Sequence, residues 1–327
     1  MWAIIAPLIL LHLAGESAAQ ALPDHDNGLL TGIFGFPEST ERGRIIRRGQ
    51  HAWDTSLIIA SHNVDKTRDG EELRLDGETT RLALTYRYGL SDKLDIGIEV
   101  PYLRHEGGSL DSIIDNFHNV LSFVGGGARA KREEDQLEIY YADSQGTLVD
   151  INNGTSGISD IRLLAGWRLS ESEGRTMALR FGIKLPTGDS DGLLGSGGTD
   201  ISFGIAGDVS GFWGNTKLSS FYRANATYLG EPERLADRYK NLVGQISFGL
   251  GYRLHQNVDL RLQSRIRSAV YDSDIESLGG TSVSLVFGAD FRISDHYRVV
   301  LSMGEDAKVG SVPDVSFQLA LRYTGEE

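Results

Sequence analysis

Arginines recur on one face of several alternating segments in this 327-residue sequence. Arg261, Arg265 and Arg267 illustrate the pattern, because each lies an even number of residues from the others. A guanidinium binds carboxylates through a planar fork of donors, so rows of guanidinium groups predict anion binding or a lattice of ion pairs. The arginines that alternation places on this face are Arg81, Arg87, Arg162, Arg168, Arg180, Arg223, Arg253, Arg261, Arg265, Arg267, Arg292 and Arg322.

Carboxylates share the face that carries these arginines. Two interpretations remain open. Unpaired arginines lining an open passage would attract anions through their summed field. Arginines paired with carboxylates would instead fill and stiffen the interior. The carboxylates are Asp54, Asp95, Glu99, Asp160, Asp200, Asp208, Asp259 and Asp290.

A second group of reactive residue types lies close together in the sequence. Asp111, Asp115 and His118 have the spacing of one helix side, and His105 precedes them. Such a group could bind a divalent metal or orient a histidine base, but charged residues on a helix surface are usually only solvated. The sequence has no G-x-S-x-G motif, and its triple-glycine run lacks the Lys of a P-loop. We therefore expect no metal, no cofactor and no catalytic residues.

The elements that carry the arginines are predicted to be long strands. In Asn241–Leu254 one face is mainly apolar and the other is rich in Gly, Ser and Gln, which is typical of a strand with two different surroundings. The predicted strands are Trp53–Ser61, Thr80–Tyr88, Leu94–Leu103, Ser159–Leu169, Arg175–Leu185, Thr199–Val209, Thr216–Leu229, Asn241–Leu254, Val258–Arg267, Thr281–Ile293, Tyr297–Met303 and Val315–Tyr323.

Short turns and long loops alternate between these strands. The turn His255–Asn257 is short, whereas Asn63–Thr79 and Pro186–Gly198 are predicted as long loops. This rhythm, an even strand number and strands long enough to cross a bilayer are typical of outer-membrane barrels. We therefore predict an all-β transmembrane antiparallel β-barrel of about twelve strands. Because an Arg facing lipid costs about 2–4 kcal/mol near the midplane, the arginine face must line the lumen.

The first residues predict export. Ala3–Ala14 is an apolar run followed by Ala19-Gln20-Ala21, which fits an A-x-A cleavage site, although no Lys or Arg precedes the run. We expect residues 1–21 to be a signal peptide cleaved near Ala21, and residues 22–327 to form the barrel in a bacterial outer membrane. The expected partners are outer-membrane lipid and lipopolysaccharide, with the barrel-assembly machinery during biogenesis.

Composition excludes several other classes. The formal net charge is −13, which disfavours nucleic-acid binding through phosphate contacts. The chain contains no Cys, which excludes disulfides and thiolate chemistry.

One long insertion, about residues 104–158, interrupts the strand pattern. Within it, Ser109–Phe123 has the apolar spacing of an amphipathic helix, which we expect to cap or plug the barrel. Gln136–Tyr141 is predicted to pair with Thr147–Ile151. The helix residues proposed for this role are Leu110, Ile113, Ile114, Phe117, His118 and Leu121.

The sequence around this insertion resembles a known family. The carrying residues include Asp76-Gly77-Glu78-Thr79, Tyr86-Arg87-Tyr88-Gly89-Leu90, Gly107-Gly108 and Phe117-His118. They resemble the uncharacterised proteobacterial proteins grouped as domain of unknown function thirty-one eighty-seven. The resemblance implies an outer-membrane barrel and implies no activity.

Taken together, these patterns predict a narrow or gated conduit for small solutes of unknown identity. A structural or recognition barrel with an occluded Arg–carboxylate lumen is the first alternative. An outer-membrane lipid-modifying enzyme is the second alternative.

Overall fold

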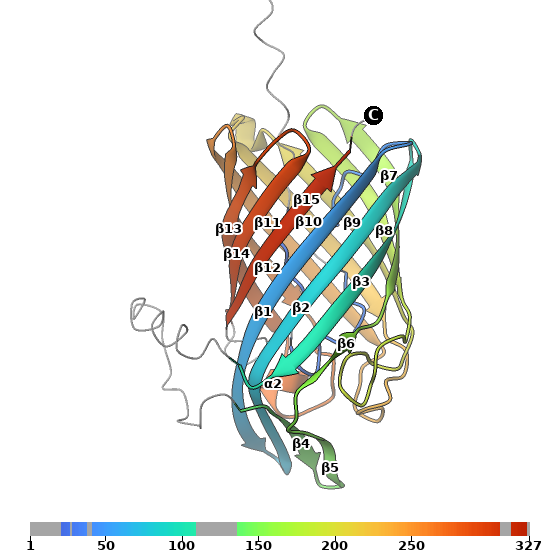
Figure 1. Ribbon diagram of the computed structural model, residues 1–327, viewed down its shortest axis with the longest axis vertical. Coiled ribbons are helices and arrows are strands. Elements are labelled where there is room, and N and C mark those ends of the chain that lie inside the picture. Colours follow the sequence, from blue (N-terminus) through green and yellow to red (C-terminus); the bar gives the residue numbers. More distant parts are fainter. Residues whose placement is uncertain (1–20, 27, 38–40, 109–135, 308–314, 326–327) are drawn as a thin grey trace, which may run out of the picture.

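Twelve antiparallel strands close into a barrel in the computed structural model, which describes residues 21–26, 28–37, 41–108, 136–307 and 315–325 (Figure 1). The prediction of a twelve-stranded β-barrel is confirmed. The barrel strands are β1 (His51–Arg68), β2 (Glu71–Ser91), β3 (Leu94–Glu106), β7 (Arg162–Ser172), β8 (Arg175–Lys184), β9 (Asp200–Ser210), β10 (Leu218–Tyr228), β11 (Leu242–His255), β12 (Val258–Arg267), β13 (Ser282–Arg292), β14 (Tyr297–Asp306) and β15 (Val315–Thr324).

Pairing between the first and last strands closes the sheet. β1 pairs with β15 from Ala52↔Thr324 to Ser61↔Val315, and each other barrel strand pairs with its neighbour in sequence. Strict alternation along these strands gives two faces. Leu319 and Leu321 are exposed on the outer face, whereas Ala320 between them is fully buried. Closure leaves no unpaired backbone edge across the spanning part, as a lipid environment requires.

The two ends of the barrel differ in their connections. The β2–β3, β7–β8, β9–β10, β11–β12 and β13–β14 connections are short and lie at the upper end in Figure 1. Longer connections lie at the opposite end, where β1 and β2 also extend beyond the other strands. Short turns at one end and long loops at the other are typical of outer-membrane barrels.

The segment Asn63–Thr79, predicted as a long loop, is instead a hairpin extending β1 and β2. Its tight turn is Asp69-Gly70, both with positive φ (48° and 87°), which suits a two-residue hairpin turn. The prediction failed because charged residues hide the alternation. Leu73 and Leu75 are buried on one face, and this apolar face covers the long-loop end of the barrel.

Three further strands extend the sheet outside the barrel. β4 (Glu138–Asp143) pairs with β2 and with β5 (Gly146–Ile151), which confirms the predicted hairpin in the long insertion. β6 (Thr155–Ile158) pairs with β3. The predicted helix Ser109–Phe123, with all six of its proposed capping residues, lies outside the described residues.

Helical structure in the described part of the chain is confined to short elements. η1 (Phe212–Gly214) forms the β9–β10 turn, and α2 (Glu276–Gly279) lies in the β12–β13 loop. Among the residues described, no helix is long and apolar enough to span a membrane.

The largest apolar core lies at the long-loop end. It joins residues of the extended hairpins and loops, such as Ile139, Tyr141 and Tyr271, to N-terminal residues such as Leu29 and Phe34. The N-terminal segment is therefore part of the folded core.

Candidate functional site: a lumen filled by the N-terminal segment

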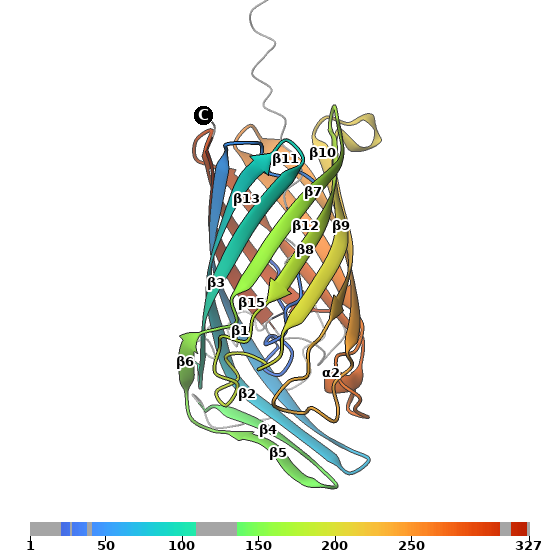
Figure 2. The same ribbon diagram turned by 90° about the vertical axis from the view of Figure 1, so that its right-hand side faces the viewer.

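The described residues between 21 and 50 (21–26, 28–37 and 41–50), here called the plug segment, run inside the barrel. Figures 1 and 2 both show this part of the chain as a dark-blue trace surrounded by strands. It has an N-terminal leg (21–26), a turn (28–36) at the long-loop end, and a return leg (41–50) that leads to β1 at the short-turn end. Its contacts with the inward face of the barrel identify the lumen as the candidate functional site.

The N-terminal leg follows β12. The Leu22 backbone N–H donates to Gln263 Oε1 at 2.9 Å. Two residues further along each segment, Arg265 forms an ion pair with Asp24 at 3.2 Å. Two residues further again, Arg267 forms an ion pair with Asp26 at 2.6 Å. Alternate residues of the leg thus meet alternate side chains of the strand.

The first residue of this ladder also makes apolar contacts. Leu22 is fully buried and packs with Val286, Val300 and Ala320, which come from β13, β14 and β15. The lumen therefore has an apolar stripe beside the arginines of β12. An extended segment that lies along β12 therefore contacts apolar side chains near Leu22 and arginine side chains near Asp26.

The turn of the plug segment is fixed by Asp26 and by the outer core. Asp26 Oδ1 accepts hydrogen bonds from Gly28 N at 3.1 Å and from Thr31 Oγ1 at 2.9 Å. The Tyr271 hydroxyl donates to Leu30 O at 2.7 Å, and the Tyr271 ring lies 5.9 Å from that of Phe34. Burial of these rings attaches the turn to the long loops.

A buried lysine joins the turn to β8 and β9. Lys184 Nζ lies 2.6 Å from Asp160 Oδ2 and 3.3 Å from Asp200 Oδ2. Asp200 Oδ2 also accepts a hydrogen bond from Gly35 N at 2.7 Å. Ser196 Oγ contacts the same ammonium group. Because the ammonium lies between the carboxylates of Asp160 and Asp200, Lys184 serves as the centre of an ion-pair cluster and not as a base for Ser196.

The return leg places a carboxylate among three arginines. Glu41 lies 3.7 Å from Arg87, 3.9 Å from Arg162 and 4.0 Å from Arg223. Arg223 Nη2 also donates to the Glu41 backbone oxygen at 2.6 Å. These arginines come from β2, β7 and β10, so Glu41 links separate parts of the wall.

Close backbone contact holds the rest of the return leg against β8 and β9. Arg180 donates to the backbone oxygens of Arg42 and Arg44 at 2.8 and 2.7 Å. A Cβ on Gly43 would lie 2.6 Å from Thr176 O and 2.7 Å from Gly207 Cα. Glycine is thus required at residue 43 by the proximity of the wall.

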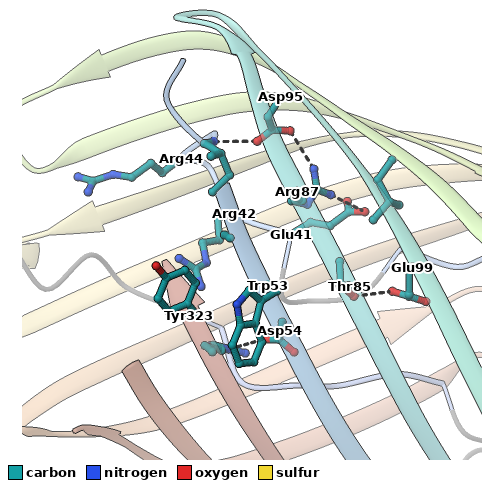
Figure 3. A pocket seen from close by; sticks show the side chains of 14 residues that line it. Glu41, Arg42, Arg44, Trp53, Asp54, Thr85, Arg87, Asp95, Glu99 and Tyr323 are labelled. Carbon is teal, nitrogen blue, oxygen red and sulfur yellow. Dashed lines mark hydrogen bonds and ion pairs between the residues drawn. The ribbon is translucent and has the colours of Figure 1, made fainter. Parts of the chain in front are cut away.

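The barrel wall carries its own ion-pair lattice around the return leg. Glu99 Oε1 lies 2.7 Å from Arg81 and 3.3 Å from Arg162. Asp95 Oδ1 lies 2.9 Å from Arg87 and 3.2 Å from Arg180. Figure 3 shows Asp95 and Arg87 beside Glu41 of the plug segment. These residues help to line a cavity of about 70 Å³. This space suits a few water molecules and is far too small for a continuous passage.

A second set of ion pairs lies on the β12–β15 side, toward the short-turn end. Asp290 lies 3.0 Å from Arg298 and 3.6 Å from Arg261. Arg322 lies 2.7 Å from Asp54 and joins β15 to β1. The described lumen therefore holds an Arg–carboxylate lattice together with the plug segment.

The twelve arginines singled out by alternation differ in burial. Arg168, Arg253 and Arg292 are half-buried near the short-turn end of their strands, where Arg168 pairs with Glu171 and Arg253 with Asp259. Arg87 is partly exposed within the lumen. The remaining members are buried inside the barrel: Arg81, Arg162, Arg180, Arg223, Arg261, Arg265, Arg267 and Arg322.

His105, from the second candidate group, is buried at the long-loop end. Thr79 Oγ1 lies 3.0 Å from its Nδ1, and its Nε2 lies 3.2 Å from Leu193 O. His118, Asp111 and Asp115 lie outside the described residues. Within the described ranges, no cluster of His, Cys, Asp and Glu has the arrangement of a metal site.

Sequence reasoning missed the plug segment and its acids Asp24, Asp26 and Glu41. The available signal was an apolar group, Leu29, Leu30, Ile33, Phe34 and Phe36, that precedes the first strand without strand alternation. Such a group needs a core to cover it, and here the outer loops and lumen supply that core.

These features define an outer-membrane β-barrel of porin-like architecture with an occupied lumen. The crystal structure of the COG4313 outer membrane channel from Pseudomonas putida F1 is similar, with a TM-score of 0.56 at 15% identity, over 89% of this chain and 99% of that chain. NanC porin has a TM-score of 0.47 at 8% sequence identity, over 84% of this chain and 98% of that chain. KdgM porin has a TM-score of 0.44 at 7% sequence identity, over 84% of this chain and 99% of that chain. At 15% sequence identity, the similarity to the COG4313 channel shows a shared fold and nothing more.

The family described as "Protein of unknown function (DUF3187)" matches residues 29–324. The chain belongs to this family, as its sequence resemblance implied. No curated protein matches the chain.

Proposed function

We propose that this barrel is a gated conduit for small solutes and that the plug segment is its gate. One observation carries the proposal: the plug segment crosses the lumen from end to end and back, and ion pairs join both of its legs to the wall. Passage then depends on displacement of at least one leg.

The chemistry of the wall supports a lumen that also exists in a water-filled state. Buried ion pairs such as Arg81–Glu99 contribute little net stability relative to apolar packing of similar volume. In a barrel with only a structural role, apolar side chains in the lumen would give equal or greater stability. Twelve strands also enclose more space than their own side chains fill, since eight are just filled. Removing a leg would therefore leave an aqueous path lined by charged groups.

The outer surface supports residence in the membrane. Leu82, Leu84 and Phe248 are among the large apolar side chains exposed on the outer face. Trp53 stacks on Tyr323 at the short-turn end, with ring centroids 5.5 Å apart, as expected for an interfacial aromatic girdle. We propose lipid around this belt and lipopolysaccharide around the long-loop end.

The test compares the full chain with a variant whose N-terminal leg is weakened. Asp24→Asn combined with Asp26→Asn removes the charges that pair with Arg265 and Arg267. In planar bilayers with potassium chloride, the full chain should open briefly and the double variant should stay open longer. Asp65→Asn, on the exposed part of β1, serves as the control and should behave as the full chain does.

Absence of current from the full chain and from the double variant would overturn the proposal. The occluded structural barrel would then be the better description. Equal open times in all three proteins would show that the N-terminal leg is not the gate.

A further inference from the structure

Gln263, Arg265 and Arg267 form a regular ladder on the inward face of β12. They contact Leu22, Asp24 and Asp26 in the same order, so each strand residue meets the plug residue 241 positions earlier. The spacing along an extended strand is about 7 Å for every two residues. The two guanidinium groups therefore lie at the spacing of carboxylates carried by alternate residues of an extended chain. We call Gln263, Arg265 and Arg267 the β12 track.

Short polar residues flank the middle of the track on both neighbouring strands. Arg265 lies between Ser247 of β11 and Ser284 of β13 in the registers of the sheet. Gln263 lies between Gly249 and Val286 in the same registers. The middle of the track thus has a serine on each side.

The two flanking hydroxyls point to a polar ligand. Ser247 is 2% exposed and Ser284 is 5% exposed. Within the part of the chain that the structure describes, neither hydroxyl has a hydrogen-bond partner. A buried hydroxyl without a partner is costly, and here each lies beside a guanidinium already bound to a carboxylate. A larger or differently placed anion could use these donors as well as Arg265.

We infer that the β12 track is a binding site for extended organic anions that carry two carboxylates about 7 Å apart, with the N-terminal leg as its resident occupant. The inference rests on the proposed function and names the substrate class. The ligand competes with Asp24 and Asp26 for Arg265 and Arg267 and so displaces the leg. An apolar end on the ligand occupies the place of Leu22 against Val286, Val300 and Ala320.

The binding test needs no membrane current. Isothermal titration of the full chain in detergent uses straight-chain dicarboxylates from succinate to suberate, with acetate as the monocarboxylate control. Affinity should rise with chain length until the carboxylates span about 7 Å, the two-residue repeat. A peptide Ala-Leu-Pro-Asp-His-Asp should also bind, and its Asn-for-Asp counterpart should bind at least about tenfold more weakly, because it loses both ion pairs.

Two variants move affinity in opposite directions. Arg265→Gln with Arg267→Gln removes the track and should abolish dicarboxylate binding. Asp24→Asn with Asp26→Asn leaves the track intact and weakens its occupant, so affinity should increase, by about tenfold if the competent fraction rises tenfold. Arg253→Gln, which removes a lumen arginine outside the track, should leave affinity unchanged. The second variant keeps the test decisive if the first does not fold.

Displacement of the leg can be measured separately. The native chain contains no Cys, so His25→Cys gives a single label site on the leg, where the native side chain is 7% exposed. Adipate should accelerate maleimide labelling of this variant, and acetate should not.

The outcomes distinguish this inference from the proposed function. Dicarboxylate binding that depends on the track, in a protein that passes no current, would refute the conduit and keep the site. Current without track-dependent binding would refute the site and keep the conduit. If affinity is the same in the full chain and in the Asp24→Asn, Asp26→Asn variant, the inference is wrong.

Discussion

Glu99 is a buried centre of the ion-pair lattice in the barrel wall. Its carboxylate is buried between Arg81 and Arg162. Changing Glu99 to Gln would leave two buried guanidinium groups without their shared counter-charge, at a cost of about 3–5 kcal/mol in free energy of unfolding. Urea unfolding in micelles, followed by tryptophan fluorescence, measures this loss.

The matched control is Glu171→Gln. Glu171 pairs with Arg168 at 2.6 Å, but both side chains are about one-quarter exposed, so its removal should cost less than about 1 kcal/mol. Equal effects of the two changes would contradict the assignment of Glu99 as a buried lattice centre.

The ion pair and hydrogen bond of Asp143 should make the stability of the β4–β5 hairpin depend on pH. The Gln145 backbone N–H donates to its carboxylate at 2.7 Å, and Arg238, which also binds Glu71, contacts it as well. The hydrogen bond from Gln145, followed by Arg238, lowers the pKa of Asp143 below its ordinary 3.8. A lowered pKa contributes stability that is fully present above pH 3.8 and is lost as the pH falls through the folded-state value.

Hydrogen exchange of the β4–β5 hairpin, corrected for the intrinsic effect of pH, checks this prediction. Protection should decrease below pH 3.8 in the native chain. Asp143→Asn should show the lower protection at neutral pH, without the acid-dependent step. The same acid step in the variant would assign the effect to another group.

At the residue scale, alternation was enough to place the arginines but not to pair them. A period of two identifies the face on which Arg265 and Arg267 lie. Their partners Asp24 and Asp26 are far away in the sequence and belong to no strand, so no local pattern connects them.

A single methyl group added at Gly43 should disturb the contact between the return leg and the barrel wall. A Cβ at residue 43 would meet backbone atoms of Thr176 and Gly207, which cannot rotate away. Gly43→Ala should therefore weaken the seated leg by about 1–3 kcal/mol through overpacking. Because 1.4 kcal/mol is a factor of ten, openings in planar bilayers should become roughly tenfold more frequent.

Gly244→Ala is the control for this change. A Cβ at residue 244 would have no neighbour within 4 Å, so its opening frequency should match that of the native chain. An unchanged opening frequency in Gly43→Ala would show that the return leg does not limit passage.

At the element scale, the sequence predicted strands where one face meets lipid. The outward residues of β11, such as Ile246 and Phe248, make the pattern unambiguous. The extension of β1 and β2 does not show this pattern, because its outward face carries exposed charges such as Asp65 and Lys66. The pattern of a membrane strand is lost there although the backbone pairing continues.

At the scale of the whole molecule, closure of twelve strands followed from strand number and turn rhythm, but occupancy of the lumen did not. Filling of the barrel depends on contacts between the plug segment and residues on almost every strand. Phe34 and Leu30, for example, contact Tyr271, which is more than 230 residues away in the sequence. Such contacts are a property of the complete fold.

A reversible cross-link between the plug segment and the wall tests the central claim most directly. A Cβ built on Gly35 would lie 3.1 Å from Asp200 Cβ, near the separation of about 3.5–4.5 Å found in disulfides. In a chain without native Cys, Gly35→Cys with Asp200→Cys can form no competing disulfide. The two single-Cys variants control for the loss of each native side chain.

Single-channel recording of the double-Cys protein should show no openings when oxidised and recovery of openings on addition of dithiothreitol. The single-Cys proteins should not respond to either treatment. Equal conductance in the oxidised and reduced double variant would contradict the account, because solutes would then pass without movement of the plug segment.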